Sequence, residues 1–480
     1  MRPGELHTSE ELFDQLVHAD VVRAQAPVVV SKALGVWEAL QEQSVTGGDV
    51  REGGEVAPIA PSGTACWHWR YATARNGQLN WGPFMSEQLK RRVAFVSPRF
   101  GAEIIGGAEA VVRDIALGLV ERDWSVEVLT TCAVNPYTWA NELPESSEVH
   151  DGILVRRFEN VLAASASKEH AVHGRIYAGE VPSLDDQVTW LNALFRTPGL
   201  FEALLREKDT FDAVIFAPYL FWTTTVCMPA VADRAVVMPC LHDEVYAYLD
   251  VMRHVLSLPA SVWFLSGPEH DLAHRMGPVT PNHSVIGSGM EVPKIYRPDK
   301  FRSEYGIDSP FLLYVGRREA DKGWPWLVDL FSRTELPVKL VCAGAGDAEV
   351  PPRLRGRVID VGLLSIDQRN NALAAALAYV QPSLNESYSR TVMESWLASR
   401  PVLARKGSTV VEWHCARSGG GTAFGTPREL AGHAERLLAD TARAKEMGER
   451  GRAYVLENYQ WPHVLDLIEA DLFSLKANSR

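Results

Sequence analysis

Residues 91–131 read RRVAFVSPRFGAEIIGGAEAVVRDIALGLVERDWSVEVLTT, and this stretch decides the fold class. Its apolar run between Arg91 and Ser97 is typical of a strand buried on both faces. Residues 108–123 then place apolar side chains at the spacing of one helix face. A second strand-like run follows from Ser125 to Thr131. Two strands joined by a helix form a βαβ unit, so we expect a parallel sheet.

The same alternation of strand and helix patterns continues downstream. Further strands are expected at 153–157, 213–217, 235–239, 262–265 and 284–286, with residues 161–207 as a polar, partly helical insertion. Strand patterns then recur at 311–316, 338–344, 358–362, 379–383 and 401–404, with helix patterns between them, and residues 429–475 read as helical. The sequence predicts an α/β protein with two Rossmann-like parallel-sheet domains that face a cleft.

We expect four parts along the chain. They are an N-terminal accessory extension (1–90), an N-terminal Rossmann-like domain (91–300), a C-terminal Rossmann-like domain (301–460) and a C-terminal helix (461–480) that packs back on the N-terminal domain. In the extension, a Gly- and Pro-rich linker at 47–64 precedes an aromatic cluster and an Asn76-Gly77 hairpin signal. The cluster is Trp67, Trp69, Tyr71, Trp81 and Phe84. It is either a ligand surface or, more commonly, a packing surface.

Composition excludes several classes of protein. The 480 residues carry 48 Lys and Arg against 60 Asp and Glu, so the net charge of 48 − 60 = −12 argues against a nucleic-acid binder. The six cysteines form no CxxC pair, which favours a reducing, cytoplasmic location. No apolar run approaches the roughly 20 residues that span a bilayer, so no transmembrane segment is expected. Peripheral contact with a membrane surface stays open.

Two groups of residues lie in loops after predicted strands, where they could bind a phosphate. Gly106-Gly107 precedes a helix, where backbone N–H groups can approach a phosphate closely. A plain βα turn looks the same, and the spacing is not the GxGxxG of nicotinamide cofactors. Arg317 and Lys322 follow the strand at 311–316 and suit a diphosphate, although a solvated charged turn would also fit.

Carboxylates and a histidine follow two other strands. Glu386 follows the strand at 379–383, and Glu394 lies eight residues later in the next helix. Carboxylates at these positions can hold hydroxyl groups, and the helix N-terminus between them can hold phosphate. His242 follows the strand at 235–239 and either faces the cleft or caps a helix. His270 and His274 lie one turn apart, but the sequence shows no third metal ligand, so we expect no metal site.

In their order, these motifs resemble glycosyltransferase family 4, the retaining nucleotide-sugar glycosyltransferases with a GT-B fold. The resemblance runs from about Arg91 to Trp461. It rests on IIGGAEAVVRDIALGL (104–119), YVGRREADKGW (314–324) and PSLNESYSRTVMESWLASRPVLA (382–404). It implies transfer of a sugar from a nucleotide-diphosphate donor, held by the C-terminal domain, to an acceptor hydroxyl, with the acceptor held by the N-terminal domain.

The resemblance also implies roles for single residues. Glu386 would hold the sugar hydroxyls, His242 would lie near the reacting carbon, and Arg317 and Lys322 would bind the diphosphate. Glu394 would hold the ribose hydroxyls. The other implied donor contacts are Gly106, Gly107, Gly344, Gly346, Leu363, Leu364, Ser387, Tyr388, Ser389, Arg390 and Thr391. The resemblance implies no metal and no cofactor beyond the nucleotide sugar as co-substrate, because cations and helix dipoles stabilise the departing diphosphate.

One motif departs from the family pattern. Relatives often read EGFG where this chain reads Glu386-Ser387-Tyr388-Ser389, and a position that needs positive φ would be strained without glycine. Arg390 adds a third cation for a phosphate. Two other classes stay open: a GT-B sugar-nucleotide epimerase or phosphorylase, and a non-catalytic sugar-nucleotide-binding protein. The base, the sugar and the acceptor are not readable, and oligomer formation through residues 1–90 stays open.

Overall fold

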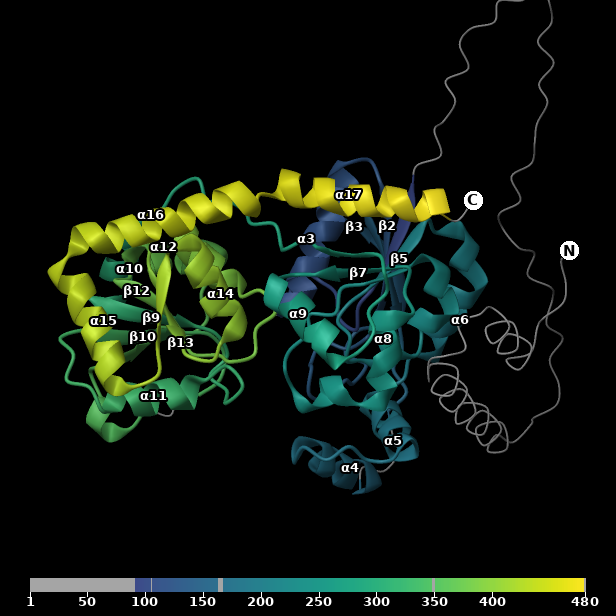
Figure 1. The fold of residues 1–480 in the computed structure, drawn as a ribbon, viewed down its shortest axis with the longest axis horizontal. Coiled ribbons are helices and arrows are strands. Elements are labelled where there is room, and N and C mark those ends of the chain that lie inside the picture. Colours follow the sequence, from purple (N-terminus) through teal and green to yellow (C-terminus); the bar gives the residue numbers. More distant parts are fainter. Residues whose placement is uncertain (1–90, 105, 163–166, 348–349, 479–480) are drawn as a thin grey trace, which may run out of the picture.

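The computed structural model describes residues 91–104, 106–162, 167–347 and 350–478, which form two α/β domains side by side (Figure 1). The expected accessory extension, with its aromatic cluster and hairpin, lies outside the described residues.

The N-terminal domain is built on an eight-stranded sheet with the order β3-β4-β2-β1-β5-β6-β7-β8. Its strands are β1 (Arg92–Val96), β2 (Ser125–Thr131), β3 (Ser146–His150), β4 (Ile153–Phe158), β5 (Ala213–Phe216), β6 (Ala235–Val237), β7 (Ser261–Phe264) and β8 (His283–Val285). Its helices are α3 (Gly107–Glu121), α4 (Ser167–Tyr177), α5 (Leu184–Leu194), α6 (Pro198–Glu207), α7 (Trp222–Thr225), α8 (Arg253–Ser257) and α9 (Gly267–Met276). Short 3₁₀ turns are η1 (Lys208–Thr210), η2 (Met228–Arg234), η3 (Val245–Tyr248) and η4 (Asp250–Met252). Strand β3 pairs antiparallel with β4, and the other pairings in this sheet are parallel.

The C-terminal domain is built on a parallel six-stranded sheet with the order β11-β10-β9-β12-β13-β14. Its strands are β9 (Phe311–Val315), β10 (Lys339–Ala343), β11 (Val358–Asp360), β12 (Ala378–Gln381), β13 (Val402–Arg405) and β14 (Gly421–Phe424). Its helices are α10 (Pro298–Tyr305), α11 (Trp324–Ser332), α12 (Ile366–Ala375), α13 (Arg390–Leu397), α14 (Thr409–Ser418), α15 (Pro427–Ala439) and α16 (Thr441–Asn458), with the turn η5 (Pro352–Leu354). The chain ends in α17 (Trp461–Asn478).

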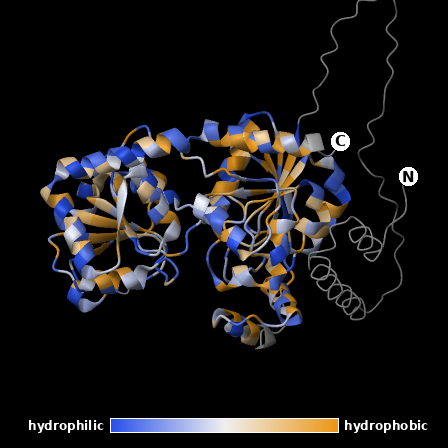
Figure 2. Ribbon diagram, in the orientation of Figure 1, coloured by the Kyte–Doolittle hydropathy of each residue, from blue (hydrophilic) through white to orange (hydrophobic). Residues whose placement is uncertain are grey.

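Burial on both faces explains why the first strand of each sheet reads as an unbroken apolar run. In β1, Val93 and Phe95 pack into one core cluster, while Ala94 and Val96 pack into another on the opposite face. Such alternation follows from the two-residue period of a strand. Figure 2 shows the same arrangement in both domains, with hydrophobic strands inside and hydrophilic residues on the outer helices. The predicted α/β class is confirmed.

The last two helices run across both domains (Figure 1). Helix α16 packs on α13 of the C-terminal domain, and α17 packs on α3 of the N-terminal domain. The Arg122 guanidinium forms an ion pair with Glu469, and the Trp263 indole N–H donates to Asp471 at 2.7 Å. The two helices together therefore connect the C-terminal domain to the N-terminal domain.

Two details of the sequence interpretation are wrong. Residues 161–207 are partly helical, as expected, but they are not a polar insertion, because α5 and α6 bury apolar residues such as Trp190 and Leu200 in the N-terminal core. Strands β3 and β14 were not expected. Strand β3 is an exposed edge strand, and β14 is a short Gly-Thr-Ala-Phe segment, so neither carries the continuous apolar pattern of a central strand. None of the described helices is long and apolar enough to span a membrane.

Candidate active site

A charged cluster lies where strands of the two sheets end. Lys322 follows β9, Glu386 follows β12, and His242 follows β6 of the other domain. The Lys322 ammonium lies 2.9 Å from the Glu386 carboxylate. The His242 imidazole interacts electrostatically with both groups. The fold thus brings together three residues that are widely separated in the sequence.

The ionisation of this cluster follows from burial and from its own charges. Burial raises the pKa of Glu386, but the Lys322 ammonium and His242 lower it more, so the pKa lies below its usual value. Burial lowers the pKa of His242, against the carboxylates of Glu244 and Glu386, which raise it. At neutral pH the Glu386 carboxylate is therefore ionised and the His242 imidazole is neutral.

Close packing of two loops fixes the position of Lys322. Gly323 has φ +72, and a Cβ atom at this position would lie 2.2 Å from the carbonyl oxygen of Pro382. A side chain at position 323 is therefore excluded by both conformation and space. The Ser383 hydroxyl lies 3.3 Å from the carbonyl oxygen of Asp321 and joins the same two loops. The loops that carry Lys322 and Glu386 are therefore packed directly against each other.

Arg317 makes a bridge between the domains. Its guanidinium donates to the Tyr137 hydroxyl at 2.8 Å and lies 2.9 Å from the Glu319 carboxylate. The Tyr137 hydroxyl, from the loop after β2, also donates to Glu319. A diphosphate that binds Arg317 has to compete with Glu319 for this guanidinium. The two predicted diphosphate cations, Arg317 and Lys322, both have carboxylate partners in this structure.

Glu394 belongs to a second charged group, and its side chain is 13% exposed. One carboxylate oxygen accepts from the Arg369 guanidinium at 2.7 Å, and the other, Oε2, has no hydrogen-bond partner. Burial raises the pKa of Glu394, against Arg369 and Arg390, which lower it. A buried acceptor without a partner is costly and can take a hydroxyl donor from a ligand.

Arg390 connects this region to the N-terminal domain. Its guanidinium donates to the Asp114 carboxylate on α3 at 2.7 Å and lies 3.5 Å from the Ser288 hydroxyl. A phosphate at Arg390 would have to replace Asp114. Tyr388, two residues earlier, is buried and donates its hydroxyl to the carbonyl oxygen of Ser288 at 2.8 Å. The Tyr388 side chain is therefore part of the core, and only its backbone is left to contact a donor.

The serine that replaces the second glycine of the EGFG pattern keeps a left-handed backbone. Ser389 has φ +69 and precedes the first residue of α13. Its hydroxyl accepts from the Gln381 side-chain amide at 2.8 Å. A non-glycine residue in this conformation stores strain, and such residues gather at functional sites. Ser387 precedes the same turn, and Thr391 is the second residue of α13.

The predicted glycine positions differ in what surrounds them. Gly106 is the N-cap of α3, and a Cβ atom there would lie 2.0 Å from the Glu109 carboxylate, whereas Gly107 has open space. Gly344 has φ +135 and packs against the carbonyl oxygen of Gly316, so the loop after β10 lies directly on the loop after β9. Gly346 also has positive φ, at +95.

Two leucines were expected beside the nucleobase. Leu363 is 64% exposed, and Leu364 is half-buried against the core. They lie between β11 and α12, at the same end of the sheet as the loop with Gly344. The exposed Leu363 side chain is open to a flat ligand.

Comparisons with known proteins show which families and folds this chain is similar to. Residues 309–440, which include Arg317, Lys322, Glu386 and Glu394, match the family described as glycosyl transferases group 1. The part of the C-terminal domain that carries this match is called the group 1 domain below. Alpha-maltose-1-phosphate synthase of Mycobacterium tuberculosis is 27% identical over 240 residues, which are 44% of this chain and 62% of that protein. Trehalose synthase of Rubrobacter xylanophilus is 28% identical over 189 residues, 34% of this chain and 44% of that protein. The chain thus spans less than two thirds of these curated relatives.

Solved structures share the two-domain architecture. Sucrose-phosphate synthase from Thermosynechococcus elongatus aligns with a TM-score of 0.62 at 18% identity, covering 81% of this chain and 100% of that chain. Anabaena HepE, in complex with UDP and glucose, aligns with a TM-score of 0.61 at 16% identity, covering 80% and 100%. At these identities the likeness shows the fold, which is GT-B.

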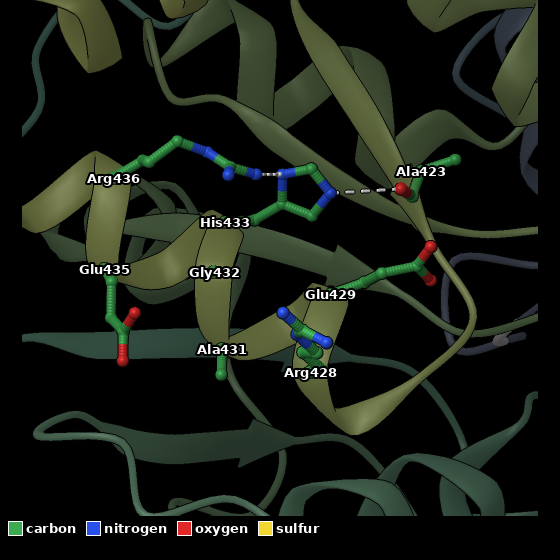
Figure 3. A pocket seen from close by; sticks show the side chains of 8 residues that line it. All are labelled: Ala423, Arg428, Glu429, Ala431, Gly432, His433, Glu435 and Arg436. Carbon is green, nitrogen blue, oxygen red and sulfur yellow. Dashed lines mark hydrogen bonds between the residues drawn. The ribbon is translucent and has the colours of Figure 1, made fainter.

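A surface hollow lies elsewhere on the group 1 domain. Its lining comes from β14 and α15 and includes Arg428, Glu429, His433 and Arg436 (Figure 3). Glu429 already forms an ion pair with Lys406. None of the sequence-predicted site residues lines this hollow, so it is separate from the candidate site.

Sequence reasoning missed the residues that hold the site residues in place. Tyr137, Asp114 and Arg369 contact predicted residues, but each lies 25 or more positions away in the chain. Another missed residue is Glu269, which is buried on α9 and accepts from the backbone N–H of Leu241 at 2.6 Å. Glu269 thereby fixes the backbone directly before His242. A single acidic residue in a helix carries no signal of such a role.

Proposed function

We propose that this protein is a retaining glycosyltransferase that moves a sugar from a nucleotide-diphosphate donor to an acceptor hydroxyl. The observation that supports this most strongly is the pair formed by Lys322 and Glu386 in the group 1 domain, which lies beside His242 of the other domain. In transfer from a sugar diphosphate, a cation can stabilise the departing diphosphate, and a carboxylate beside it can accept hydrogen bonds from the sugar hydroxyls.

Each side chain has a task in the proposed reaction. The bond between the anomeric carbon and the diphosphate breaks, and a bond to the acceptor oxygen forms on the same face. The proton of the acceptor hydroxyl passes to the departing diphosphate oxygen. Lys322 stabilises the negative charge that develops on the departing diphosphate. Glu386, held ionised by Lys322, accepts hydrogen bonds from sugar hydroxyls. His242, neutral at pH 7, donates to or accepts from the sugar without adding charge.

The donor nucleotide would lie on the group 1 domain. The free Oε2 of Glu394 accepts a hydroxyl of the ribose, and Arg317 turns from Glu319 to the diphosphate. UDP-glucose is the first donor to test, because the similarly folded HepE has been solved with it. Retention of anomeric configuration, independence from metal and a cytoplasmic location stay predictions.

The experiment is a transfer assay on the full chain in EDTA. UDP-glucose is tried first, followed by GDP-, ADP- and dTDP-sugars with a panel of sugar and lipid acceptors. Release of nucleoside diphosphate is measured, and proton NMR reads the anomeric configuration of the product. We expect an α-linked donor to give an α-linked product. Release of an epimer would support the epimerase class, and donor binding without turnover across the whole panel would support a binding protein.

A further inference from the structure

Three histidines to which the proposed transfer gives no role meet on the N-terminal domain. His270 and His274 lie one turn apart on α9, and His283 is the first residue of β8. Their nitrogen ligand atoms all lie within 4.8 Å of one another. The ring centroids are 4.4 Å apart for His270 and His274, and 5.2 and 5.1 Å from these to His283. The sequence showed two of these residues, and the fold supplies the third.

Hydrogen bonds to two of the rings fix which nitrogen is available. The Nδ1 atom of His270 lies 3.0 Å from the Asp271 carboxylate, and the Nδ1 atom of His283 lies 2.8 Å from the carbonyl oxygen of Thr280. Both partners are acceptors, so each Nδ1 carries the proton and each Nε2 keeps its lone pair. Histidines that bind metals are oriented in this way, with the second nitrogen donating to a carboxylate or carbonyl.

The Phe264 ring packs near His270 and His283, whereas His274 is exposed. The Phe264 ring of β7 packs edge-on against His270, with centroids 5.4 Å apart, and lies 6.2 Å from the ring of His283. His274 is exposed, so its side chain can rotate toward the other two. Within the described part of the chain, this is the one group of three or more histidine, cysteine or acidic residues with such spacing.

We propose that His270, His274 and His283 bind a divalent transition-metal ion, zinc in the first place, with water as the fourth ligand. Imidazole suits zinc, and three histidines leave one position of a tetrahedron open. Zinc–nitrogen bonds of about 2.0–2.1 Å place the ligand nitrogens about 3.3 Å apart, so the rings close in slightly on binding.

The ion would link helix α9, which carries His270 and His274, to strand β8, which carries His283. Strand β8 is at the edge of its sheet and pairs with β7 through three residues. Helix α9 connects these strands, and its first residue, Gly267, packs against Trp413 of α14 in the group 1 domain. Metal binding at this place stabilises the sheet edge and the helix that contacts the other domain. It goes beyond the proposed transfer reaction, which does not use these residues.

The test measures metal binding directly. The full chain, stripped with chelator and dialysed, is titrated with Zn²⁺ by calorimetry and with Co²⁺ by visible absorption, which reports tetrahedral coordination. We expect one ion per chain and a higher melting temperature with Zn²⁺. His274→Gln and His283→Gln should weaken the affinity at least tenfold. His463→Gln, at an exposed histidine of α17 outside the cluster, should match the wild type.

Two results would overturn the proposal. One is the absence of Zn²⁺ binding at micromolar concentrations. The other is equal affinity in the wild type and in His274→Gln, which would place any bound zinc at other residues. His274 is exposed, so His274→Gln should keep the fold, which circular dichroism checks even if His283→Gln unfolds the edge strand.

Discussion

Replacing Lys322 by alanine removes the cation that we assign to the departing diphosphate. In the free protein its Nζ atom lies 2.9 Å from Glu386, and the Lys322 side chain is 33% exposed. At an effective dielectric constant of about 20, one charge pair at this distance interacts by about 5.7 kcal/mol, which is an upper bound because solvent screens the ammonium. Loss of one transition-state contact of this type costs about 2.7 kcal/mol, or about a hundredfold in kcat/KM.

Fold stability should change less than activity. The pair between a partly exposed ammonium and Glu386 contributes about 1 kcal/mol to the free energy of unfolding. Without the Lys322 side chain, the pKa of Glu386 rises, because burial raises it and Lys322 no longer lowers it. The acidic limb of the pH–rate profile should therefore move to higher pH. The double variant Lys322→Ala/Glu386→Gln should lose less than the product of the two single losses, because both act on one group.

The assay is the initial rate of nucleoside diphosphate release, together with the melting temperature of each variant. Lys339→Ala is the matched control. Lys339 is 30% exposed, pairs with Asp308 at 3.6 Å, and lies at the opposite end of the same sheet. A folded Lys322→Ala variant with kcat/KM within threefold of the wild type would refute the assignment.

Three further results are expected. Glu386→Gln should abolish most of the transfer activity, while Glu394→Gln should mainly weaken nucleotide binding. Calorimetry with free nucleoside diphosphate tests this, and equally tight binding by Glu394→Gln and the wild type would contradict the second expectation. Deletion of residues 1–60 should leave donor binding intact, because the predicted donor contacts lie downstream; a folded truncation that no longer binds the donor would show that the extension belongs to the donor site. Burial lowers the pKa of His254 to about 4 and that of His414 to about 3, from 6.5. The unfolded chain therefore binds more protons below about pH 6.5. The free energy of unfolding should fall by about 1.4 kcal/mol per pH unit for each histidine as the pH drops below about 6.5, and urea titrations measure this fall. His254→Gln should make the pH dependence of the free energy of unfolding less steep.

The sequence predicted what depends on local pattern. Strands β1 and β9 were readable because each is buried on both faces and therefore continuously apolar. Lys322 and Glu386 could be singled out because each lies in a loop that follows a parallel strand. The fold was therefore accessible before any coordinates.

Contacts between distant segments were not readable. Arg390 pairs with Asp114 across 276 positions, and Arg317 meets Tyr137 across 180. Neither partner belongs to a motif, since Asp114 looks like any polar residue on an amphipathic helix. The sequence predicted backbone strain at Ser389 only if the turn needs a positive φ there. The structure shows that it does, because Ser389 keeps the left-handed conformation although it is not glycine.

The central claim is that the group 1 domain binds a nucleotide sugar through Lys322 and Glu394. The most direct measurement is the melting temperature of the full chain with UDP-, GDP-, ADP- and dTDP-sugars, in the wild type and in the double variant Lys322→Ala/Glu394→Gln. A ligand at one hundred times its Kd adds about 2.7 kcal/mol of stability. We predict that at least one donor raises the wild-type melting temperature and that the double variant loses this shift. No shift with any donor, or an equal shift in the double variant, would contradict the claim.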